Sequence, residues 1–467
     1  MPRPQRMSGL DDSFLSLETA TQPLQVFCVI ELDTASIPGG YTFDRFRDAM
    51  ATRLRVIPEF REKLSDPLLN VDFPVWVPDG DFDINNHVHR IGLPPPGRRA
   101  ELEQLCGYLA GLRLDHSRPL WEMWVIEGLD GGGVAVMLML HHAIADGVTF
   151  ADILSRLCSD EPDPPTPALI QAAPRAGTLR IVIDGLVRFA GRPRQIVRLL
   201  PPTMRAVIET VRRVASGRAM ALPFTAARTV LNGRMTSERR IALARLDLDD
   251  VKKVARHFGV KVNDVAMALV GRQVRQFFIE RGELPRKSLI ALVPVGAHED
   301  PNCPAYNQVS GIFGKIQTQI EDPAERLRAV AAASLIAKEH SAALGVTLLN
   351  DWGQVIGPVL LGIAKRVYAR LTRVRPMYNV VVSNVPGPPH TRHFLGAGVS
   401  AIYMFGPVMH GVGINVSLFS TNGALHVAVI SCPALLADPR AVADGVSAGL
   451  NELLAEIDGP PTISAAG

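Results

Sequence analysis

The chain has 467 residues, too many for one ordinary core, and this length predicts two domains of roughly 200 residues each plus a connector. Hydrophobic residues make up 47% of the chain, charged residues 20%, and the mean hydropathy is +0.15, which favours a protein that handles apolar ligands. A net charge of only +3 and an aromatic content of 6% give no support for nucleic-acid binding, so we expect no nucleic acid among its partners.

The N-terminus and the cysteines indicate a cytoplasmic protein. The basic start of the chain is followed by Asp11 and Asp12 instead of an apolar stretch, so it is not a secretory signal. The cysteines lie far apart, with an odd count and no Cys-x-x-Cys pair, which argues against a zinc site and against a disulfide framework. No run reaches the roughly 18 apolar residues that a membrane-spanning helix needs. We therefore expect a cytoplasmic chain that crosses no membrane.

Residues 1–165 form the first predicted domain, of mixed α/β structure. Within it, residues 26–32 are strand-like, whereas residues 43–54 and 98–112 have the apolar spacing of helices. Residues 160–175 are acidic and rich in proline, a composition that cannot pack as a helix or a central strand. The first domain is therefore expected to end there.

Residues 166–230 form the predicted connector, which is rich in proline and arginine. Between residues 175 and 218, ten arginines stand against two acidic residues, Asp184 and Glu209. The apolar residues between 204 and 214 recur at helical spacing opposite arginines, which predicts a basic amphipathic helix. Such a helix suits an anionic membrane surface, but a connector that docks its apolar side on a domain has the same pattern. Both alternatives stay open.

Residues 231–467 form the second predicted domain, which again alternates strands and helices. Strands are expected at 240–246, 288–295, 379–383, 413–419 and 424–431, and helices at 248–258, 263–279 and 323–344. The two halves are thus similarly built, and no short period indicates a solenoid or a propeller.

Two adjacent histidines, His141 and His142, follow directly on an apolar run at 134–140 that fits a buried strand. Successive strand side chains point to opposite faces, so one histidine can face a cleft while the other faces the packed side. A histidine is suited to removing a hydroxyl proton near neutral pH. A metal site would need a third ligand, and none is evident nearby in the sequence. We therefore expect one histidine to act as a base, and no metal.

The segment from His141 to Gly147 resembles the HHxxxDG signature of coenzyme-A-dependent acyltransferases and of the condensation domains related to chloramphenicol acetyltransferase. Other segments are similar to the bacterial wax ester synthase/acyl-CoA:diacylglycerol acyltransferase family, in its triacylglycerol synthase branch. They are Leu10-Asp-Asp-Ser-Phe-Leu15, Arg118-Pro-Leu-Trp-Glu122, Val262-Asn-Asp-Val-Ala266, Tyr306-Asn-Gln-Val-Ser310 and Val382-Ser-Asn-Val-Pro-Gly-Pro388. The resemblance runs from residue 10 to about residue 455.

The resemblance implies an α/β fold of two chloramphenicol acetyltransferase-like domains with an interdomain tunnel. It implies that His142 is the general base, that Asp146 organises the site, and that His141 and Gly147 belong to the same catalytic segment. Acyl-CoA is then a co-substrate, no cofactor is needed, and the acceptor is a diacylglycerol or a long-chain alcohol. The expected location is the cytoplasm, at a membrane or lipid-droplet surface. A carrier-protein-dependent lipid acyltransferase and a catalytically silent lipid-binding paralogue are the alternatives.

Asn263 is the candidate donor to the reaction's oxyanion from the second domain. Residues 262–264 resemble the family's Asn-Asp motif, but asparagine before an apolar helix is also a favoured N-cap, and this alternative stays open. The sequence departs from the family at Gly296, where the family usually has a serine, which puts a hydrogen bond from that position in doubt.

Ser447 lies in a segment, Gly-Val-Ser-Ala-Gly, that matches the nucleophile elbow of serine hydrolases. Such an elbow must lie between a strand and a helix. Residues 438–457 instead have the pattern of one amphipathic helix, so we reject a serine hydrolase.

Overall fold

The computed structural model describes residues 5–168, 177–296, 309–345, 348–390, 392–409 and 411–458. The first half and the connecting helix consist of α1 (Gly9–Leu17), β1 (Gln25–Asp33), α2 (Phe43–Arg53), β2 (Glu62–Ser65), β3 (Val75–Pro78), β4 (Val88–Gly92), α3 (Arg99–Ala110), β5 (Trp121–Glu127), β6 (Val134–His141), α4 (Gly147–Leu157), β7 (Cys158–Ser159) and α5 (Thr178–Ala215). The second half consists of β8 (Arg240–Asp247), α6 (Leu248–Phe258), α7 (Val262–Glu280), β9 (Ile290–Gly296), β10 (Val309–Lys315), α8 (Pro323–Leu344), α9 (Leu348–Val374), β11 (Val380–Pro386), β12 (His393–Phe394), β13 (Ala397–Phe405), β14 (Ile414–Thr421), β15 (Ala424–Ser431), α10 (Arg440–Ala443) and α11 (Gly445–Asp458).

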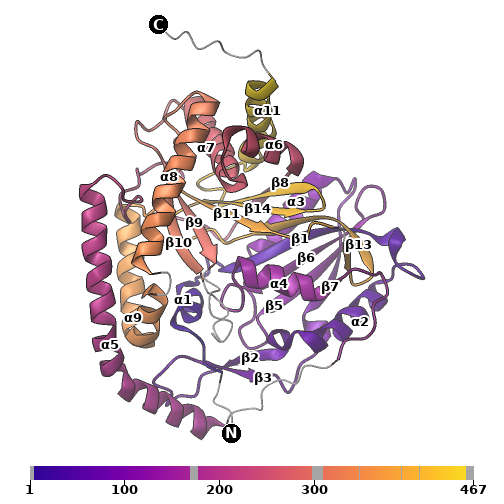
Figure 1. Cartoon of the computed structure of the whole chain (residues 1–467). Helices are drawn as coiled ribbons and strands as arrows, with labels where there is room; N and C mark the ends of the chain where they lie inside the picture. The colour runs from indigo at the N-terminus through magenta and orange to yellow at the C-terminus, as the bar shows by residue number, and fades with distance from the viewer. Residues whose placement is uncertain are drawn as a thin grey trace.

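Two large sheets carry the fold (Figure 1). The seven-stranded sheet has the order β4-β5-β6-β1-β13-β12-β7, and the six-stranded sheet has the order β10-β9-β11-β14-β15-β8. Most neighbouring strands are antiparallel, but β4 runs parallel to β5, and β11 runs parallel to both β9 and β14. The sheets are therefore mixed, as expected for a fold in which strands alternate with helices.

A strand from the end of the chain completes the first sheet. β13 pairs antiparallel with β1, with Phe27 opposite Phe405, and the two rings stack with centroids 4.4 Å apart. β12 then links β13 to β7. The predicted domains 1–165 and 231–467 did not include this exchange, which places residues 393–405 in the first sheet. A buried strand has the same apolar pattern in either sheet, so local sequence could not reveal it.

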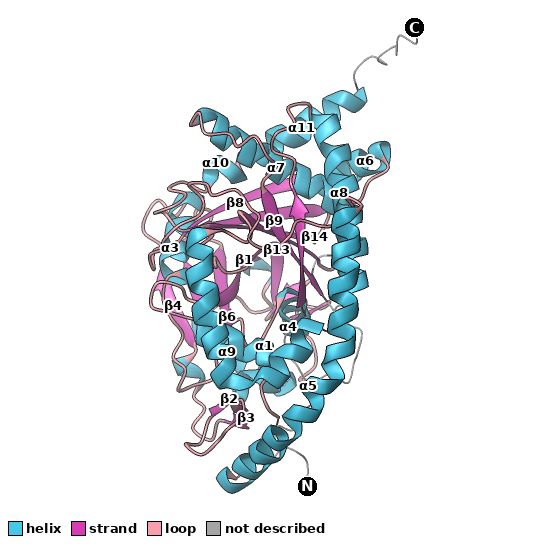
Figure 2. Cartoon of the chain, turned by 90° about the vertical axis from the view of Figure 1, so that its left-hand side faces the viewer, coloured by secondary structure: helices cyan, strands magenta, loops and turns pink. Residues whose placement is uncertain are grey.

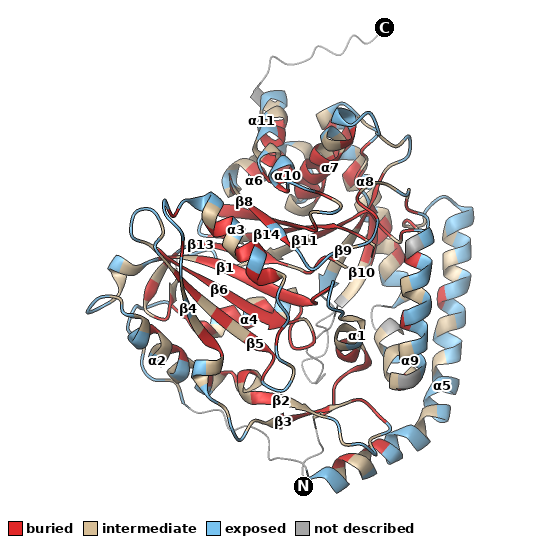
Figure 3. Cartoon of the chain, turned by 180° about the vertical axis from the view of Figure 1, so that it is seen from behind, coloured by how far each residue is buried: buried red, intermediate tan, exposed pale blue. Residues whose placement is uncertain are grey.

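Both faces of the first sheet are buried, which explains the continuous apolar runs of its central strands. On β1, Cys28 and Ile30 belong to a core with α2 and α4, whereas Phe27 and Val29 face α3 and the second sheet. The second sheet packs one face against α6, α7, α10 and α11. Figure 3 shows these strands as the buried centre of the molecule.

α5 and α9 lie on the outside of the molecule and contact each other over part of their length (Figures 1 and 2). The predicted basic helix covered only residues 204–214, whereas α5 is longer and continues through Pro193, Pro201 and Pro202. Because proline disfavours a helix interior, the sequence did not predict that one helix continues through these positions. A second correction concerns residues 438–457, which form α10 and α11, separated at Asp444, instead of one helix.

Candidate active site

The loop after β6 presents His142 at the end of the first sheet. The backbone N–H of His141 donates to the Leu120 carbonyl at 2.9 Å, and that of His142 donates to the Leu24 carbonyl at 2.8 Å. The N–H of Ile144 donates to the His141 carbonyl at 3.0 Å and closes a turn around His142. His141 is fully buried, whereas His142 is partly exposed, so the two histidines are not equivalent.

His141 lies in a polar cluster with Glu18 and His116. Its Nε2 is 3.9 Å from Glu18 Oε1, while Glu18 Oε2 lies 2.9 Å from His116 Nε2 and 2.8 Å from the Arg113 guanidinium. Burial lowers the pKa of His141 to about 3, so its ring is neutral near neutral pH. Burial raises the pKa of Glu18, but contacts with His116 and Arg113 outweigh burial and lower it to about 2, so the carboxyl is ionised.

Glu18, His116 and His141 have the donor set of a metal site, because their candidate ligand atoms lie within 4.8 Å of one another. No third ligand was evident near the two histidines in the sequence, but the fold brings Glu18, at the end of α1, and His116, before β5, close to His141. However, His141 Nδ1 accepts a hydrogen bond from the Ala143 N–H at 3.0 Å, which leaves the ring proton on Nε2. That proton occupies the atom that would have to bind the metal.

α1 covers one face of His142. The ring of Phe14 stacks on the imidazole with centroids 3.9 Å apart and planes inclined by 13°. α1 is fixed in turn by Lys365 of α9, whose ammonium lies 3.2 Å from the Asp12 carboxylate. Leu10 to Leu15 carried a family resemblance without a known role, and the structure places this segment directly against the histidine.

Asp146 and Gly147 begin α4 immediately after the turn. The buried Asp146 carboxylate accepts hydrogen bonds from the backbone N–H groups of Val148, at 3.1 Å, and Thr149, at 2.8 Å, so it is the N-cap of α4. A Cβ atom on Gly147 would lie 3.2 Å from Val385 Cγ2 of β11. The absence of a side chain at Gly147 therefore lets the start of α4 approach the second half of the chain closely.

A cavity of about 510 Å³ lies where α4 meets the second half. Its lining includes Val148 of α4, Asn263 of α7, Gly296 of β9, Lys338 of α8 and Asn384 of β11. The predicted residue Asn263 therefore lines the same cavity as Val148, the residue that follows Gly147. Gly296, where the family usually has a serine, adds no side-chain donor to this wall.

The alternative that Asn263 is the N-cap of its helix is wrong. Asn263 is the second residue of α7, and the N-cap position belongs to Lys261, whose backbone N–H donates to the Asp264 carboxylate at 3.1 Å. Asp264 therefore stabilises the helix start. The rejection of Ser447 as a nucleophile is confirmed, because it lies inside α11, which follows α10 and not a strand.

The outer sides of α5 and α9 form an apolar and basic surface, called here the α5/α9 surface. Its exposed apolar side chains are Leu179, Ile183, Leu186, Val187, Phe189, Ile196, Val197, Leu200, Met204, Val207, Ile208, Val211 and Val214 of α5, and Leu360, Ile363, Val367, Leu371 and Val374 of α9. Arg194, Arg198, Arg205 and Arg212 of α5 are also exposed. Figure 3 shows α5 exposed along much of its length, and the helix also contacts α8 and α9. In the part of the chain that is described, no helix is both long and apolar enough to cross a membrane.

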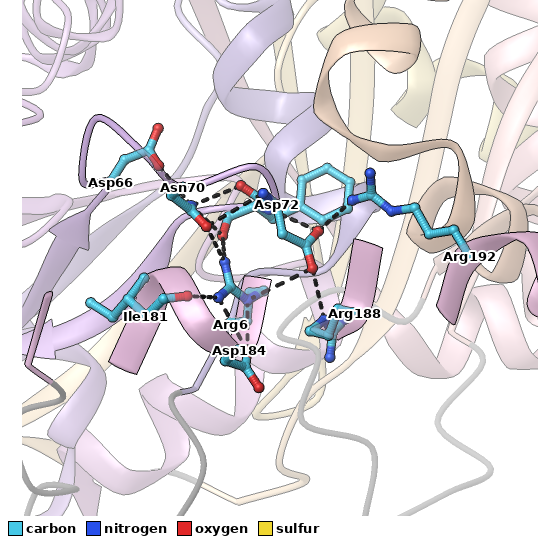
Figure 4. A network of polar contacts seen from close by, with 9 residues as sticks. Arg6, Asp66, Asn70, Asp72, Ile181, Asp184, Arg188 and Arg192 are labelled. Carbon is cyan, nitrogen blue, oxygen red and sulfur yellow. Dashed lines mark hydrogen bonds and ion pairs between the residues drawn. The ribbon is translucent and has the colours of Figure 1, made fainter. Parts of the chain in front are cut away.

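A charged network anchors the first turns of α5 to the N-terminal segment (Figure 4). The carboxylate of Asp72 lies 2.8 Å from Arg188, 2.6 Å from Arg192 and 3.9 Å from Arg6, and Arg6 in turn lies 3.1 Å from Asp184 of α5. Arg6 and Asp72 are buried, so these contacts are shielded from salt. The network holds the first half of α5 against the N-terminal segment, while the second half of the helix contacts α8 and α9.

Two family models match this chain. Residues 7–266 match the wax ester synthase/diacylglycerol acyltransferase catalytic domain, and residues 306–454 match the C-terminal domain of that family. A Mycobacterium tuberculosis H37Rv protein named as a candidate diacylglycerol O-acyltransferase is 46% identical over 98% of this chain and 91% of its own length. A second protein of that strain with the same kind of name is 30% identical over 96% of this chain and 97% of its own length.

Solved structures confirm the predicted fold class. The wax ester synthase/diacylglycerol acyltransferase from Marinobacter aquaeolei VT8 superposes with a TM-score of 0.71 at 25% identity, covering 98% of this chain and all of that one. The first condensation domain of the calcium-dependent antibiotic synthetase superposes with a TM-score of 0.60 at 15% identity, covering 97% and 96% of the two chains, and shows the shared fold alone. This chain therefore belongs to the wax ester synthase/diacylglycerol acyltransferase family of O-acyltransferases.

Proposed function

We propose that this chain is a diacylglycerol O-acyltransferase that transfers a long-chain acyl group from acyl-CoA to a diacylglycerol hydroxyl, with long-chain alcohols as further acceptors. The observation that carries the proposal is the placement of His142. It is partly exposed and lies on a hydrogen-bonded turn, six residues before Val148, which lines the interdomain cavity of about 510 Å³. The names of the relatives support the same substrate class.

In the proposed mechanism His142 is the general base. The acceptor hydroxyl gives its proton to the imidazole as its oxygen attacks the thioester carbonyl carbon. The oxyanion that forms accepts a hydrogen bond from the Asn263 side-chain amide, which lines the cavity. When the C–S bond breaks, the proton on His142 passes to the departing sulfur, so that CoA leaves as a thiol and the imidazole is neutral again. These steps require neither a cofactor nor a covalent enzyme intermediate.

The proposal is tested with purified protein and radiolabelled palmitoyl-CoA, with diacylglycerol and hexadecanol supplied in parallel. We expect labelled triacylglycerol from the native chain, a loss of about 10²- to 10⁴-fold in His142→Ala, and a loss of about 10²- to 10³-fold in Asn263→Ala. His390→Ala is the matched control, because His390 is an exposed histidine with a 3.4 Å contact to Asp160.

Other outcomes would contradict this reaction. Turnover with acyl-carrier protein but not with acyl-CoA would favour the carrier-dependent alternative. Lipid binding by a well-folded native chain without turnover from either donor would favour a catalytically silent paralogue.

The α5/α9 surface is the proposed site of contact with an anionic membrane or lipid-droplet surface. Isolated exposed apolar residues are normal, but many of them on each of two outer helices, interleaved with arginines on α5, are typical of interfacial binding. Burying apolar side chains in the lipid and placing arginines near anionic headgroups act together, so binding should weaken as salt increases. This orientation would bring lipid acceptors to the side of the molecule where α9 contacts α1.

Vesicle flotation tests this surface. The native chain should float with vesicles that contain phosphatidylglycerol and float less with pure phosphatidylcholine. The double variant Val187→Asp/Val207→Asp, which charges two exposed positions on α5, should lose flotation, whereas Leu68→Asp, at a 99% exposed position outside both helices, should not. Equal flotation of the double variant and the control would contradict the assignment.

A further inference from the structure

We propose that Glu18 is a positioning residue, which fixes the ring tautomer of His141 and so holds the turn that presents His142. This inference rests on the proposed role of His142 as the base. Glu18 contacts no reacting atom in this proposal and acts through His141, whose own ring is completely buried.

The backbone of the turn requires one tautomer of His141. Two N–H groups of the turn end on this residue: Ile144 donates to its carbonyl at 3.0 Å, and Ala143 donates to its Nδ1 at 3.0 Å. Nδ1 can accept only if it carries no proton, so a neutral ring must carry its proton on Nε2. The opposite tautomer would bring two hydrogens face to face between Nδ1 and Ala143, and the turn around His142 would have to open.

Glu18 supplies the reason for that tautomer. Its Oε1 and the His141 Nε2 face each other at 3.9 Å, and neither atom has a hydrogen-bond partner among the described residues. This distance is too long for a direct hydrogen bond, so the ionised carboxylate acts electrostatically, favouring the tautomer whose N–H dipole points toward it. Arg113, 2.8 Å from Glu18 Oε2, and His116, at 2.9 Å, hold the carboxylate in this place.

A metal ion bound by Glu18, His116 and His141 is the competing explanation of the cluster. Metal binding through Nε2 would require the proton to move to Nδ1, where histidine ligands normally donate a hydrogen bond. At His141, Nδ1 faces the Ala143 N–H and can only accept. Arg113 beside Glu18 adds positive charge, which further disfavours a cation.

Nitrogen-15 NMR of protein labelled at histidine tests the tautomer directly. In the native chain we expect His141 to show a protonated Nε2 and an unprotonated Nδ1, unchanged between pH 8 and pH 6. In Glu18→Gln, which keeps the shape but removes the charge, signals of the other tautomer should appear. Glu59→Gln is the matched control, since Glu59 is a partly buried partner of Arg156 outside the site, and it should leave the His141 signals unchanged.

Steady-state kinetics, in the native chain and in a His141→Asn variant, distinguish a positioning role of Glu18 from a general effect on stability. Glu18→Gln should lower kcat about 10-fold or more with little change in the KM for acyl-CoA. His141→Asn offers a side-chain oxygen that can accept the Ala143 N–H as in an Asx-turn, without a tautomer to control. In that background Glu18→Gln should have little further effect on kcat.

Three results would overturn the proposal. They are a native His141 protonated on Nδ1, an unchanged kcat in Glu18→Gln, and one tightly bound metal per chain whose removal by a chelator shifts the His141 signals. The spectra report the tautomer independently of turnover, so a failure of the proposed acyl transfer would appear in the assay alone.

Discussion

The ring of Phe14 lies against the ring of His142, with centroids 3.9 Å apart and planes inclined by 13°. This contact joins the first helix of the chain to the turn after β6, and it restricts the rotation of the imidazole. A stacked aromatic pair contributes about 0.5–1.5 kcal/mol beyond the area it buries.

We therefore expect Phe14→Ala to lower kcat/KM by roughly 2- to 10-fold, because His142 loses the ring that orients it. Phe14→Tyr keeps a stacked ring and should retain most of the activity. Steady-state kinetics of both variants check this expectation, and equal losses in the two variants would contradict it.

Substitution of Asp146 should affect stability through the helix cap. Asp146→Ala removes the acceptor for the N–H groups of Val148 and Thr149 and should cost about 1–2 kcal/mol in the free energy of unfolding. Asp146→Asn keeps a side-chain oxygen and should retain most of this stability. Urea unfolding compares the two variants, and an Asn variant as unstable as the Ala variant would show that the carboxylate has a further structural role.

Gly147→Ala should strain the contact between the two halves. Its Cβ would stand 3.2 Å from Val385 Cγ2, so we expect a loss of about 1–3 kcal/mol in the free energy of unfolding. Val385→Ala removes the opposing methyl group, and the double variant should be less unstable than the sum of the single variants. A double-mutant cycle measures this coupling, and simple additivity would show that the two positions do not meet.

Lys365 and Asp12 form a buried pair between α9 and α1, with an N···O distance of 3.2 Å. Burial lowers the pKa of Lys365, and the neighbouring Asp12 offsets only part of this effect, so the charge on Lys365 depends on its partner. Lys365→Met should cost about 3 kcal/mol or more, because it leaves the Asp12 carboxylate buried without its partner. The double variant Lys365→Met/Asp12→Leu should recover most of the lost unfolding free energy. Thermal or urea unfolding of both variants measures this recovery.

The burial of His141 should make the unfolding free energy depend on pH. Its pKa is lowered by burial from 6.5 to about 3, so below pH 6.5 the unfolded chain binds a proton there that the folded chain does not. Stability should therefore fall as the pH falls from 6.5 toward 3, by about 1.4 kcal/mol per pH unit for this group. Glu18, whose pKa is lowered from 4.5 to about 2, adds a loss in the same direction below pH 4.5.

His141→Asn isolates the histidine part of this dependence. As the pH falls from 6.5 to 4.5, the unfolding free energy of this variant should fall less steeply than that of the native chain. The difference in slope should correspond to the uptake of about one proton on unfolding. His426, whose burial lowers its pKa to about 4, contributes equally to both proteins and cancels in the comparison. Identical slopes for the two proteins would contradict the assignment.

Local pattern was sufficient to predict much of the fold. The apolar run before His141 and the five strands expected in the second half follow from periodicity, and the structure contains them. The length of α5 was not predictable, since three interior prolines argue against a helix. The place of residues 393–405 was not predictable either, because pairing between distant strands leaves no local mark.

The candidate site was predictable where its residues adjoin in sequence. His141, His142, Asp146 and Gly147 form one segment; the apolar run before it indicated a strand end, and the resemblance indicated that the four residues belong together. The contributions of Phe14 and Glu18 depend on how α1 packs against that segment, which no local pattern records. The resemblance at residues 10–15 pointed to this part of α1, but only the structure shows which side chains touch the histidines.

The pairing of β1 with β13 constrains how the protein can be made and recombined. A chain emerging from the ribosome has no partner for this edge of β1 until Phe405 has been synthesised, so an apolar strand edge stays uncovered for most of translation. A fragment that ends after the connector would keep this uncovered edge. A chimera of two relatives that is joined once, between the halves, would pair a β1 from one parent with a β13 from the other, so a sound exchange of halves must move residues 393–405 together with the N-terminal half.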